Sequence, residues 1–302
     1  MKSDIERLSE MLENEVFKKD VMEDVLANWR GRLPILPFNI LVKSKILRSS
    51  TNNDLAFHHN IARLSYPPID KSKTDRASLK GIPMFYGSIF TSAAEKYNAY
   101  PSIMTAFETM DILRDYKSKG CVFTTQSLWV NNRELKVFAF PFSKRYKKPC
   151  DEILHVQKKW ERISKEEDPE AVAMAEYIGD LMAMVNESCL YEITASVVHD
   201  ILYNWALSDN LDGIIYPSVW GDGQGMNVCL KRETVDECVR FKGARLVRIQ
   251  KDEGESTVET VANSVDVGNG KLRWKSTKSA LALLRRQYSD KQLVEGCILE
   301  IE

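Results

Sequence analysis

The segment NLDGIIYPSVWGDGQGMNVCL, residues 210–230, holds two short apolar runs separated by a glycine-rich turn. The first run covers residues 213–217 and the second covers residues 226–230. Short apolar runs on either side of a turn rich in Gly and Asp are typical of a β-hairpin. Pro217 and Ser218 stand where the first strand ends. We therefore expect a hairpin that carries a serine to the end of a buried strand.

Around this hairpin, the sequence predicts strands, then a block of helices, then further strands. Strands are expected at residues 39–47, 82–88, 122–129, 135–142 and 244–250, with the third and fourth paired as a hairpin through Asn131-Asn132. Helices are expected at residues 3–30, 102–115, 151–165, 169–187 and 191–207, with Ser102 as an N-cap. This order is typical of an α+β fold and not of a regular βαβ repeat.

Length and charge narrow the class of protein. The chain has 302 residues, of which 44% are hydrophobic and 28% charged, as is usual for a globular protein. It has 42 basic and 43 acidic residues, so it lacks the basic excess of nucleic-acid-binding proteins. No apolar stretch approaches the roughly 20 residues of a membrane helix, and the charged N-terminus is no signal peptide. We expect a cytoplasmic protein that binds neither nucleic acid nor membrane.

The cysteines and histidines do not form a metal motif. The six cysteines, at positions 121, 150, 189, 229, 238 and 297, include no CxxC pair and are expected to be free thiols. His58 and His59 are adjacent and therefore point in different directions in any regular element. No metal is expected. The glycines of residues 221–225 lack the spacing of a dinucleotide loop and precede a strand, so they are expected to form a turn.

Four segments carry residue types that bind phosphate or stabilise positive charge. ILRSS places Arg48 at a strand end, and DRASLKGIPMFYGS contains Arg76 and Tyr86. TAFETM places Glu108 on a helix, and DGIIYPS ends on Ser218. None of these segments is specific alone, but their order along the chain narrows the choice of family.

This order of motifs resembles the RES-domain family, which is named for its arginine, glutamate and serine. The family's middle segment reads approximately GRAN-x-x-G-x-P-x-x-Y, and the chain reads DRASLKGIPMFY at residues 75–86. Ser78 replaces the family's asparagine, which would weaken a local turn bond. The segments SYPP, TTQSLWV with LKVFAF, and Gly225-Met226-Asn227 also look like the family, and the resemblance covers about residues 41–250.

The resemblance implies an ADP-ribosyltransferase-like fold, with a mixed β-sheet core and flanking helices, and chemistry on NAD. It divides the chain into an N-terminal helical extension (1–40), an NAD-binding catalytic domain (41–250) and a C-terminal extension (251–302). The first extension is expected to cap the core, or to form an oligomer or antitoxin surface through its apolar stripes. Residues 251–256 are expected to be a polar linker, followed by a hairpin near residues 268–270 and a helix near residues 276–287.

The resemblance also implies roles for single residues. Catalytic roles fall to Glu108, Ser218 and Arg48, and NAD-binding roles to Arg76, Tyr86 and Asn227. Cleavage of the nicotinamide–ribose bond develops positive charge on the sugar, which a glutamate carboxylate would stabilise. Arginine makes forked bonds to phosphate, so both arginines would hold the pyrophosphate. The tyrosine would stack on nicotinamide or ribose, and the serine would bind substrate or orient the glutamate.

Two of these assignments have rivals in the sequence. Arg63 competes with Arg48, which follows the apolar run directly. Glu95 is nearer the family's spacing from Tyr86 than Glu108, which requires an insertion. Ser218 is not expected to be a nucleophile, because no histidine or lysine is positioned by the sequence to activate it.

Three functions follow from the resemblance. The first is an enzyme that cleaves NAD with phosphate or water as acceptor, as a bacterial toxin neutralised by an antitoxin. The second is a transferase of ADP-ribose to a target protein. The third is a catalytically silent module that binds a nucleotide or a partner, motivated by Ser78 and by the two candidate glutamates. The acceptor and the oligomeric state are left open.

Overall fold

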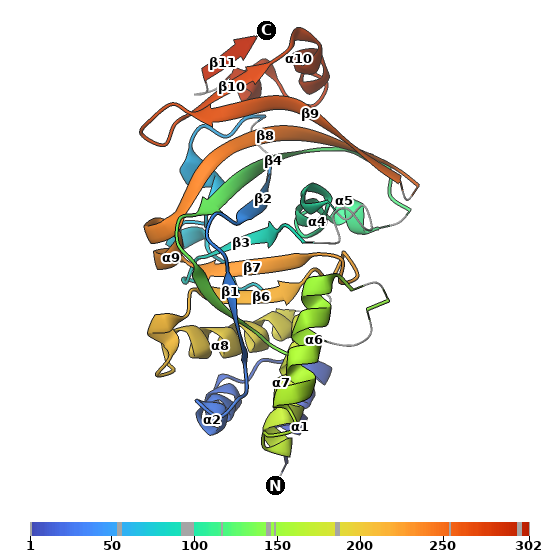
Figure 1. Ribbon diagram of the computed structural model, residues 1–302. Coiled ribbons are helices and arrows are strands. Elements are labelled where there is room, and N and C mark those ends of the chain that lie inside the picture. The colour runs from blue at the N-terminus through green and yellow to red at the C-terminus, as the bar shows by residue number, and fades with distance from the viewer. Residues whose placement is uncertain are drawn as a thin grey trace.

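All the strands that the structure describes lie in one sheet (Figure 1). The computed structural model describes residues 2–52, 56–91, 100–115, 117–142, 146–147, 149–184, 188–253, 255–294 and 298–301. The strands are β1 (Leu36–Ile40), β2 (Lys45–Thr51), β3 (Met84–Ile89), β4 (Gly120–Asn131), β5 (Leu135–Ala139), β6 (Gly213–Pro217), β7 (Met226–Lys231), β8 (Val239–Asp252), β9 (Glu255–Asp266), β10 (Leu272–Ser276) and β11 (Ile298–Ile301).

The sheet is mixed, with the order β1-β5-β6-β7-β3-β2-β4-β8-β9-β10-β11. The pairs β5–β6 and β10–β11 are parallel, and the other neighbouring pairs are antiparallel. Helices flank this sheet, so the expected combination of a mixed sheet with flanking helices is confirmed. The predicted hairpin of β6 and β7 is also confirmed, with Tyr216 opposite Asn227.

Most of the described helices lie at two places along the sheet. The described helices are α1 (Asp4–Glu13), α2 (Lys19–Trp29), α4 (Pro101–Phe107), α5 (Asp111–Arg114), α6 (Asp151–Ile163), α7 (Pro169–Met182), α8 (Ser188–Tyr203), α9 (Arg232–Cys238), α10 (Lys278–Leu284) and α11 (Asp290–Val294), with short 3-10 turns η1 (Ile61–Leu64), η2 (Ile69–Lys71) and η3 (Ser208–Asn210). In Figure 1, α1, α2, α7 and α8 lie together below β6, whereas α4 and α5 lie beside β2 and β3.

The N-terminal region is two helices and not one. Ser3 begins α1 with a capping box, in which its side chain accepts from the Glu6 amide and the Glu6 carboxylate accepts from the Ser3 amide. Buried Leu8 and Met11 pack this helix into the main core, and α2 contacts α8. An ion pair from Arg30 to Asp200, 2.5 Å long, fixes the end of α2 to α8. Burial of these apolar faces joins the N-terminal helices to the rest of the protein.

The predicted pairing of residues 122–129 with 135–142 is wrong. β4 pairs with β2 on one side and with β8 on the other, and β5 pairs with β1 and β6. Both edges of β4 are therefore occupied, so β5 has no edge of β4 to join. The Asn131 amide donates to the carbonyls of Leu41 and Arg133 and holds the chain where it leaves β4.

The predicted helix 102–115 is also interrupted. It begins after Tyr100 with Pro101 in the first helical position, a favourable place for proline, so Ser102 lies inside the helix and is not its cap. α4 ends at Phe107 and α5 begins at Asp111. Glu108 thus lies at the C-terminal cap of α4, where the chain turns.

The C-terminal strands continue the sheet directly. β8 runs through residue 250, and a tight turn joins it to β9, so the expected linker at residues 251–256 is instead a β-hairpin. The predicted hairpin near residues 268–270 joins β9 to β10 and is confirmed. Trp274 is fully buried, and its indole N–H donates to the carbonyl of His58 at 2.9 Å. The C-terminal strands therefore support the segment that leads from β2 towards β3.

Two further expectations concern cysteines and membranes. Cys121, Cys150, Cys189, Cys229 and Cys238 are free, as predicted, and Cys297 lies outside the described residues. Over the described ranges, no helix has both the length and the apolar character needed to span a bilayer.

The buried His58 predicts a pH dependence of folding stability. The side chain is 5% exposed, and burial, together with nearby Arg63 and His59, lowers its pKa from 6.5 to about 4. The unfolded chain therefore binds a proton first, and stability falls as the pH drops from 6.5 towards 4. The loss from this group is about 3 kcal/mol, at about 1.4 kcal/mol per pH unit.

Urea unfolding of the wild type and of His58→Gln between pH 7 and pH 4 measures this contribution. The variant should lose less stability over that range, even if it is less stable at pH 7. His59→Gln is the matched control: it removes only a smaller contribution to the lowered pKa of His58 and should keep most of the wild-type slope. Equal slopes for the wild type and His58→Gln would contradict the assignment.

Candidate active site

A cavity of about 180 Å³ brings five of the six predicted site residues together. Its lining includes Arg48, Arg76, Tyr86, Glu108 and Asn227, contributed by β2, the segment before β3, β3, the end of α4, and β7. Ser218, the sixth, is fully buried behind the cavity and bonds to one of its lining residues. Residues more than 170 positions apart in sequence therefore meet at one place.

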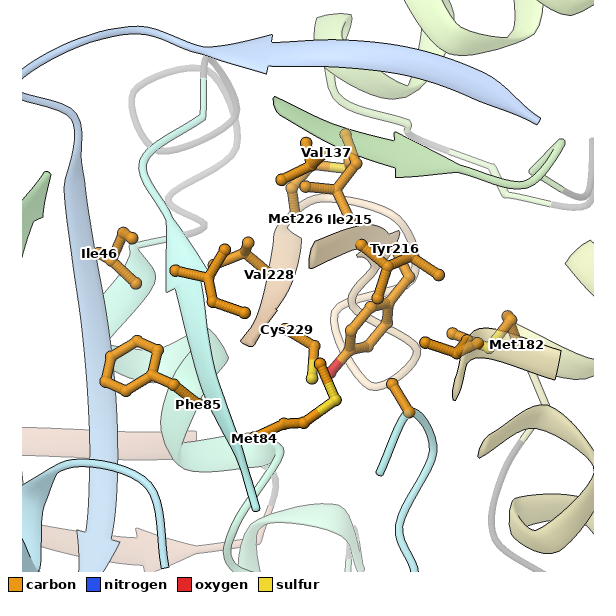
Figure 2. Packing of buried hydrophobic residues seen from close by; sticks show 14 of the residues in the cluster. Ile46, Met84, Phe85, Val137, Met182, Ile215, Tyr216, Met226, Val228 and Cys229 are labelled. Atoms are coloured by element: carbon orange, nitrogen blue, oxygen red, sulfur yellow. The ribbon is translucent and has the colours of Figure 1, made fainter. Parts of the chain in front are cut away.

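The strand register selects which side chains face this cavity. Ser88 and Tyr216 both stand opposite Asn227 in neighbouring strands, so the three side chains share one face of the sheet. Ile215 and Met226 alternate with them and point to the other face. Figure 2 shows these two residues grouped with Val137, whereas the Tyr216 hydroxyl points towards Met84 and Cys229.

Glu108 and Ser218 are joined by a short hydrogen bond. The Ser218 hydroxyl donates to Glu108 Oε1 at 2.6 Å and accepts from the amide of Gly221 at 3.1 Å. α4 is itself held against the sheet, because the Thr105 hydroxyl accepts from the Ser49 amide and the Gln126 amide donates to the Ser102 carbonyl. Ser218 can therefore fix one carboxylate oxygen of Glu108, as expected for an orienting residue.

The glycine turn allows this contact. Gly223 has a φ of +77°, a conformation that favours glycine, and Gly221 lies against α4. A β-carbon on Gly221 would lie 2.5 Å from Met104 Sδ and 3.0 Å from Ser218 Oγ. The turn therefore lets the end of β6 approach the end of α4 closely.

Arg48 is a cation without a carboxylate partner among the described residues. Its Nη1 donates to the carbonyl of Tyr86 at 2.7 Å, and its guanidinium lies 5.5 Å from the centre of the Phe85 ring. Its Nε is buried without a described hydrogen-bond partner. Burial lowers the pKa of Arg48, although a guanidinium remains protonated at neutral pH. A partly buried charge of this kind is stabilised when an anion binds it.

Arg76 is more deeply buried and is held between aromatic rings. It is 4% exposed, and its Nη1 donates to the carbonyl of Met182 at 2.6 Å. The guanidinium lies 5.2 Å from the Tyr191 ring and 5.9 Å from the Tyr216 ring. These contacts fix the orientation of Arg76, and its Nη2 also donates to the Tyr191 hydroxyl over a long 3.4 Å.

Tyr86 supports the segment that carries Arg76. Its hydroxyl accepts from the amide of Ala77 at 3.0 Å and donates to Ser78 Oγ at 3.1 Å. Burial raises the pKa of Tyr86 well above its usual value, so the hydroxyl stays neutral. The two backbone hydrogen bonds between Asp75 and Ser78 close the turn. Ser78, which departs from the family pattern, is therefore integrated into the turn by other bonds.

Asn227 offers an unused donor at the cavity wall. Its side chain is 3% exposed, and Oδ1 accepts from the Ser88 hydroxyl at 2.8 Å. Its Nδ2 is buried and has no hydrogen-bond partner within the described part of the chain. A buried polar atom without a partner is costly, and a ligand that accepts from Nδ2 would remove that cost.

Several lining residues had no signal in the sequence. Arg114 donates to the carbonyls of Phe107 and Glu108, at 2.8 and 2.5 Å, and so caps the end of α4. It also lies 4.9 Å from the centre of the Trp220 ring. Tyr191 also lines the cavity without such a signal. Their neighbours along the chain form no recognisable pattern, because packing between distant elements brings them to the cavity.

The two rival residues have different outcomes. Arg63 is exposed on η1 and does not line the cavity, which favours Arg48 as the first arginine of the site. Glu95 lies outside the described residues. The structure describes Glu108, which lines the cavity and accepts a hydrogen bond from Ser218.

Comparisons with known proteins add no assignment. Neither a family model nor a curated protein matches the chain. In the described part of the chain, no three His, Cys, Asp or Glu side chains cluster as metal ligands would. The geometry of the cavity is therefore the basis for any statement about function.

Gly221→Ala should destabilise the protein by about 1–3 kcal/mol, because the new methyl group overlaps Met104 and crowds Ser218. Urea unfolding of this variant, of Met104→Ala and of the double variant measures the overlap as a coupling energy. The double variant should be more stable than the sum of the two single changes predicts. Strict additivity would show that Gly221 is not required for close approach to α4.

Proposed function

We propose that the protein is an enzyme that consumes NAD by cleaving its nicotinamide–ribose bond, on a fold like that of the ADP-ribosyltransferases. The observation that carries this proposal is the cavity in which Glu108, oriented by Ser218, faces the same space as Arg48 and Arg76. One carboxylate and two guanidiniums in one cavity suit a ligand that develops positive charge at a sugar and carries negative phosphates.

The arginines support a phosphate-bearing ligand. Among the described residues, Arg48 has no carboxylate partner. The described hydrogen bonds of the Arg76 side chain go to the Met182 carbonyl and the Tyr191 hydroxyl. A diphosphate would supply the missing negative charge and accept forked bonds from either guanidinium. Asn227 Nδ2 would donate to the same ligand, with an amide or ribose oxygen as a suitable acceptor.

Glu108 supports cleavage at the sugar. When the bond between C1 of the ribose and the nicotinamide nitrogen breaks, the electron pair leaves with nicotinamide, which departs as a neutral molecule. The ribose then carries the positive charge of an oxocarbenium-like ion. A carboxylate held at a fixed position stabilises that charge without reorganising during the reaction. The acceptor adds to C1 and loses its proton to complete the reaction.

The aromatic walls support binding of a flat, cationic ring. Tyr86, Tyr191, Tyr216 and Trp220 all line the cavity. Oxidised nicotinamide is a pyridinium, and aromatic faces attract cations. The Tyr86 hydroxyl is already bonded to the turn at Ser78, so this residue would use its ring and not its hydroxyl.

Incubation of the purified protein with NAD, with and without phosphate, tests the activity directly. Release of free nicotinamide together with ADP-ribose would indicate water as acceptor, and a phosphorylated ADP-ribose would indicate phosphate. Labelled NAD added to lysate would report transfer to protein. Binding without any of these products would assign a silent nucleotide-binding module and overturn the proposal. Growth arrest on expression, with loss of cellular NAD, is expected of a toxin.

Glu108→Gln should lower kcat for nicotinamide release by roughly 100-fold or more, because it removes the negative charge that faces the sugar. The amide keeps the shape of the carboxyl group, so NAD should still bind with similar affinity in calorimetry. Glu95→Gln is the comparison that separates the two candidate glutamates. Full activity of Glu108→Gln with loss in Glu95→Gln would transfer the catalytic role to Glu95.

Ser218→Ala should lower kcat by about 100-fold with little change in KM, because the hydroxyl positions Glu108 and does not line the cavity. A purely structural role would lower the amount of folded protein and leave kcat per folded molecule unchanged. The kinetic constants should therefore be measured on protein whose folded fraction is known from circular dichroism. An increase in KM alone would show that Ser218 serves substrate binding instead.

A further inference from the structure

A second cavity, of about 550 Å³, adjoins the first. The two share Arg48, Asp75, Tyr86 and Tyr191 among their lining residues. Because four side chains border both spaces, the two cavities are neighbours around the Arg48 guanidinium. Glu108, the carboxylate expected to stabilise the sugar cation, borders only the first cavity.

A dinucleotide substrate would need more space than the first cavity offers. Pockets for ligands of drug size usually measure about 300–1,000 Å³. The first cavity, at about 180 Å³, is too small for a complete dinucleotide. It suits the nicotinamide and its ribose, so the remainder of the molecule must lie elsewhere, and the adjoining space begins at the shared Arg48.

The lining of the second cavity suits phosphates beside an apolar group. Lys71 and Lys73 contribute two ammonium groups in addition to the shared Arg48. The opposing charges are Asp75 and Glu192, so cations exceed anions around this space. Apolar surface is provided by Pro67 and Met84, which a purine ring can contact.

The loop that carries the lysines is held in place by its own bonds. The Ser72 hydroxyl accepts from the amide of Gly81 at 2.8 Å, and the Thr74 hydroxyl accepts from the amide of Lys80 at 3.3 Å. The hydroxyl of Tyr86, on β3, accepts from the Ala77 amide and so joins the following turn of the loop to the sheet. The backbone below both lysines is therefore ordered before a ligand binds, which lowers the entropy cost of binding.

We propose that this second cavity binds the adenosine diphosphate half of NAD. Arg48 contacts the diphosphate where the cavities meet, Lys71 and Lys73 bind phosphate oxygens, and the purine lies against Pro67 and Met84. This proposal depends on the proposed function, which supplies NAD as the substrate. It makes the enzyme selective for the dinucleotide, because nicotinamide mononucleotide would leave the second cavity unfilled.

A double variant, Lys71→Ala with Lys73→Ala, tests this selectivity. Both side chains are exposed, so the changes should not affect folding. KM for NAD should rise roughly tenfold with kcat nearly unchanged, and KM for nicotinamide mononucleotide should not change. Lys80→Ala is the matched control: it removes an exposed lysine from the same loop that lines neither cavity.

Calorimetry with ADP gives a readout that does not depend on catalysis. The wild type should bind ADP, and the double variant should bind it roughly tenfold more weakly, whereas Lys80→Ala should bind it as the wild type does. If NAD is cleaved but the double variant keeps the wild-type KM for NAD and affinity for ADP, the second cavity is not the nucleotide site. If the wild type cleaves no NAD, the proposed function fails, and ADP binding alone then decides whether the cavity holds a nucleotide.

Discussion

The hydrogen bond between Ser218 and Glu108 connects two parts of the chain that are 110 residues apart. One partner stands at the end of β6 and the other at the C-terminal cap of α4. For the two to meet at 2.6 Å, α4 must pack on β2 and β3, and the turn after β6 must approach α4 without a side chain at Gly221. The position of the carboxylate therefore depends on the sheet, the helix and the turn together.

Two buried polar atoms without described partners lower the stability of the protein at the cavity. The Arg48 Nε and the Asn227 Nδ2 are both buried, and neither has a described hydrogen-bond partner. Each such atom costs free energy in the unliganded protein, and replacement by apolar side chains would remove that cost. Two of these atoms at one cavity, beside an oriented carboxylate, are more easily explained by a ligand than by the needs of folding.

Local patterns predicted part of the structure well. The β6–β7 hairpin follows from two short apolar runs around a glycine turn, and Ser218 stands directly after β6, as expected. The pairing of β4 could not be predicted, because it depends on which distant strands occupy its edges. The break before Asp111 was missed because the apolar spacing continues through it, whereas Arg114 caps α4 through contacts that no sequence spacing encodes.

Strand alternation explains how one hairpin serves both the core and the cavity. Ile215 and Met226 lie in the apolar core beside Val137 (Figure 2). Their neighbours Tyr216 and Asn227 line the cavity instead. A shift of one residue in register would exchange the two sets, placing isoleucine in the cavity and an asparagine in the core. The turn and the burial of the apolar set oppose that shift. The same forces that fold the hairpin therefore determine which of its side chains can meet Glu108 and a ligand.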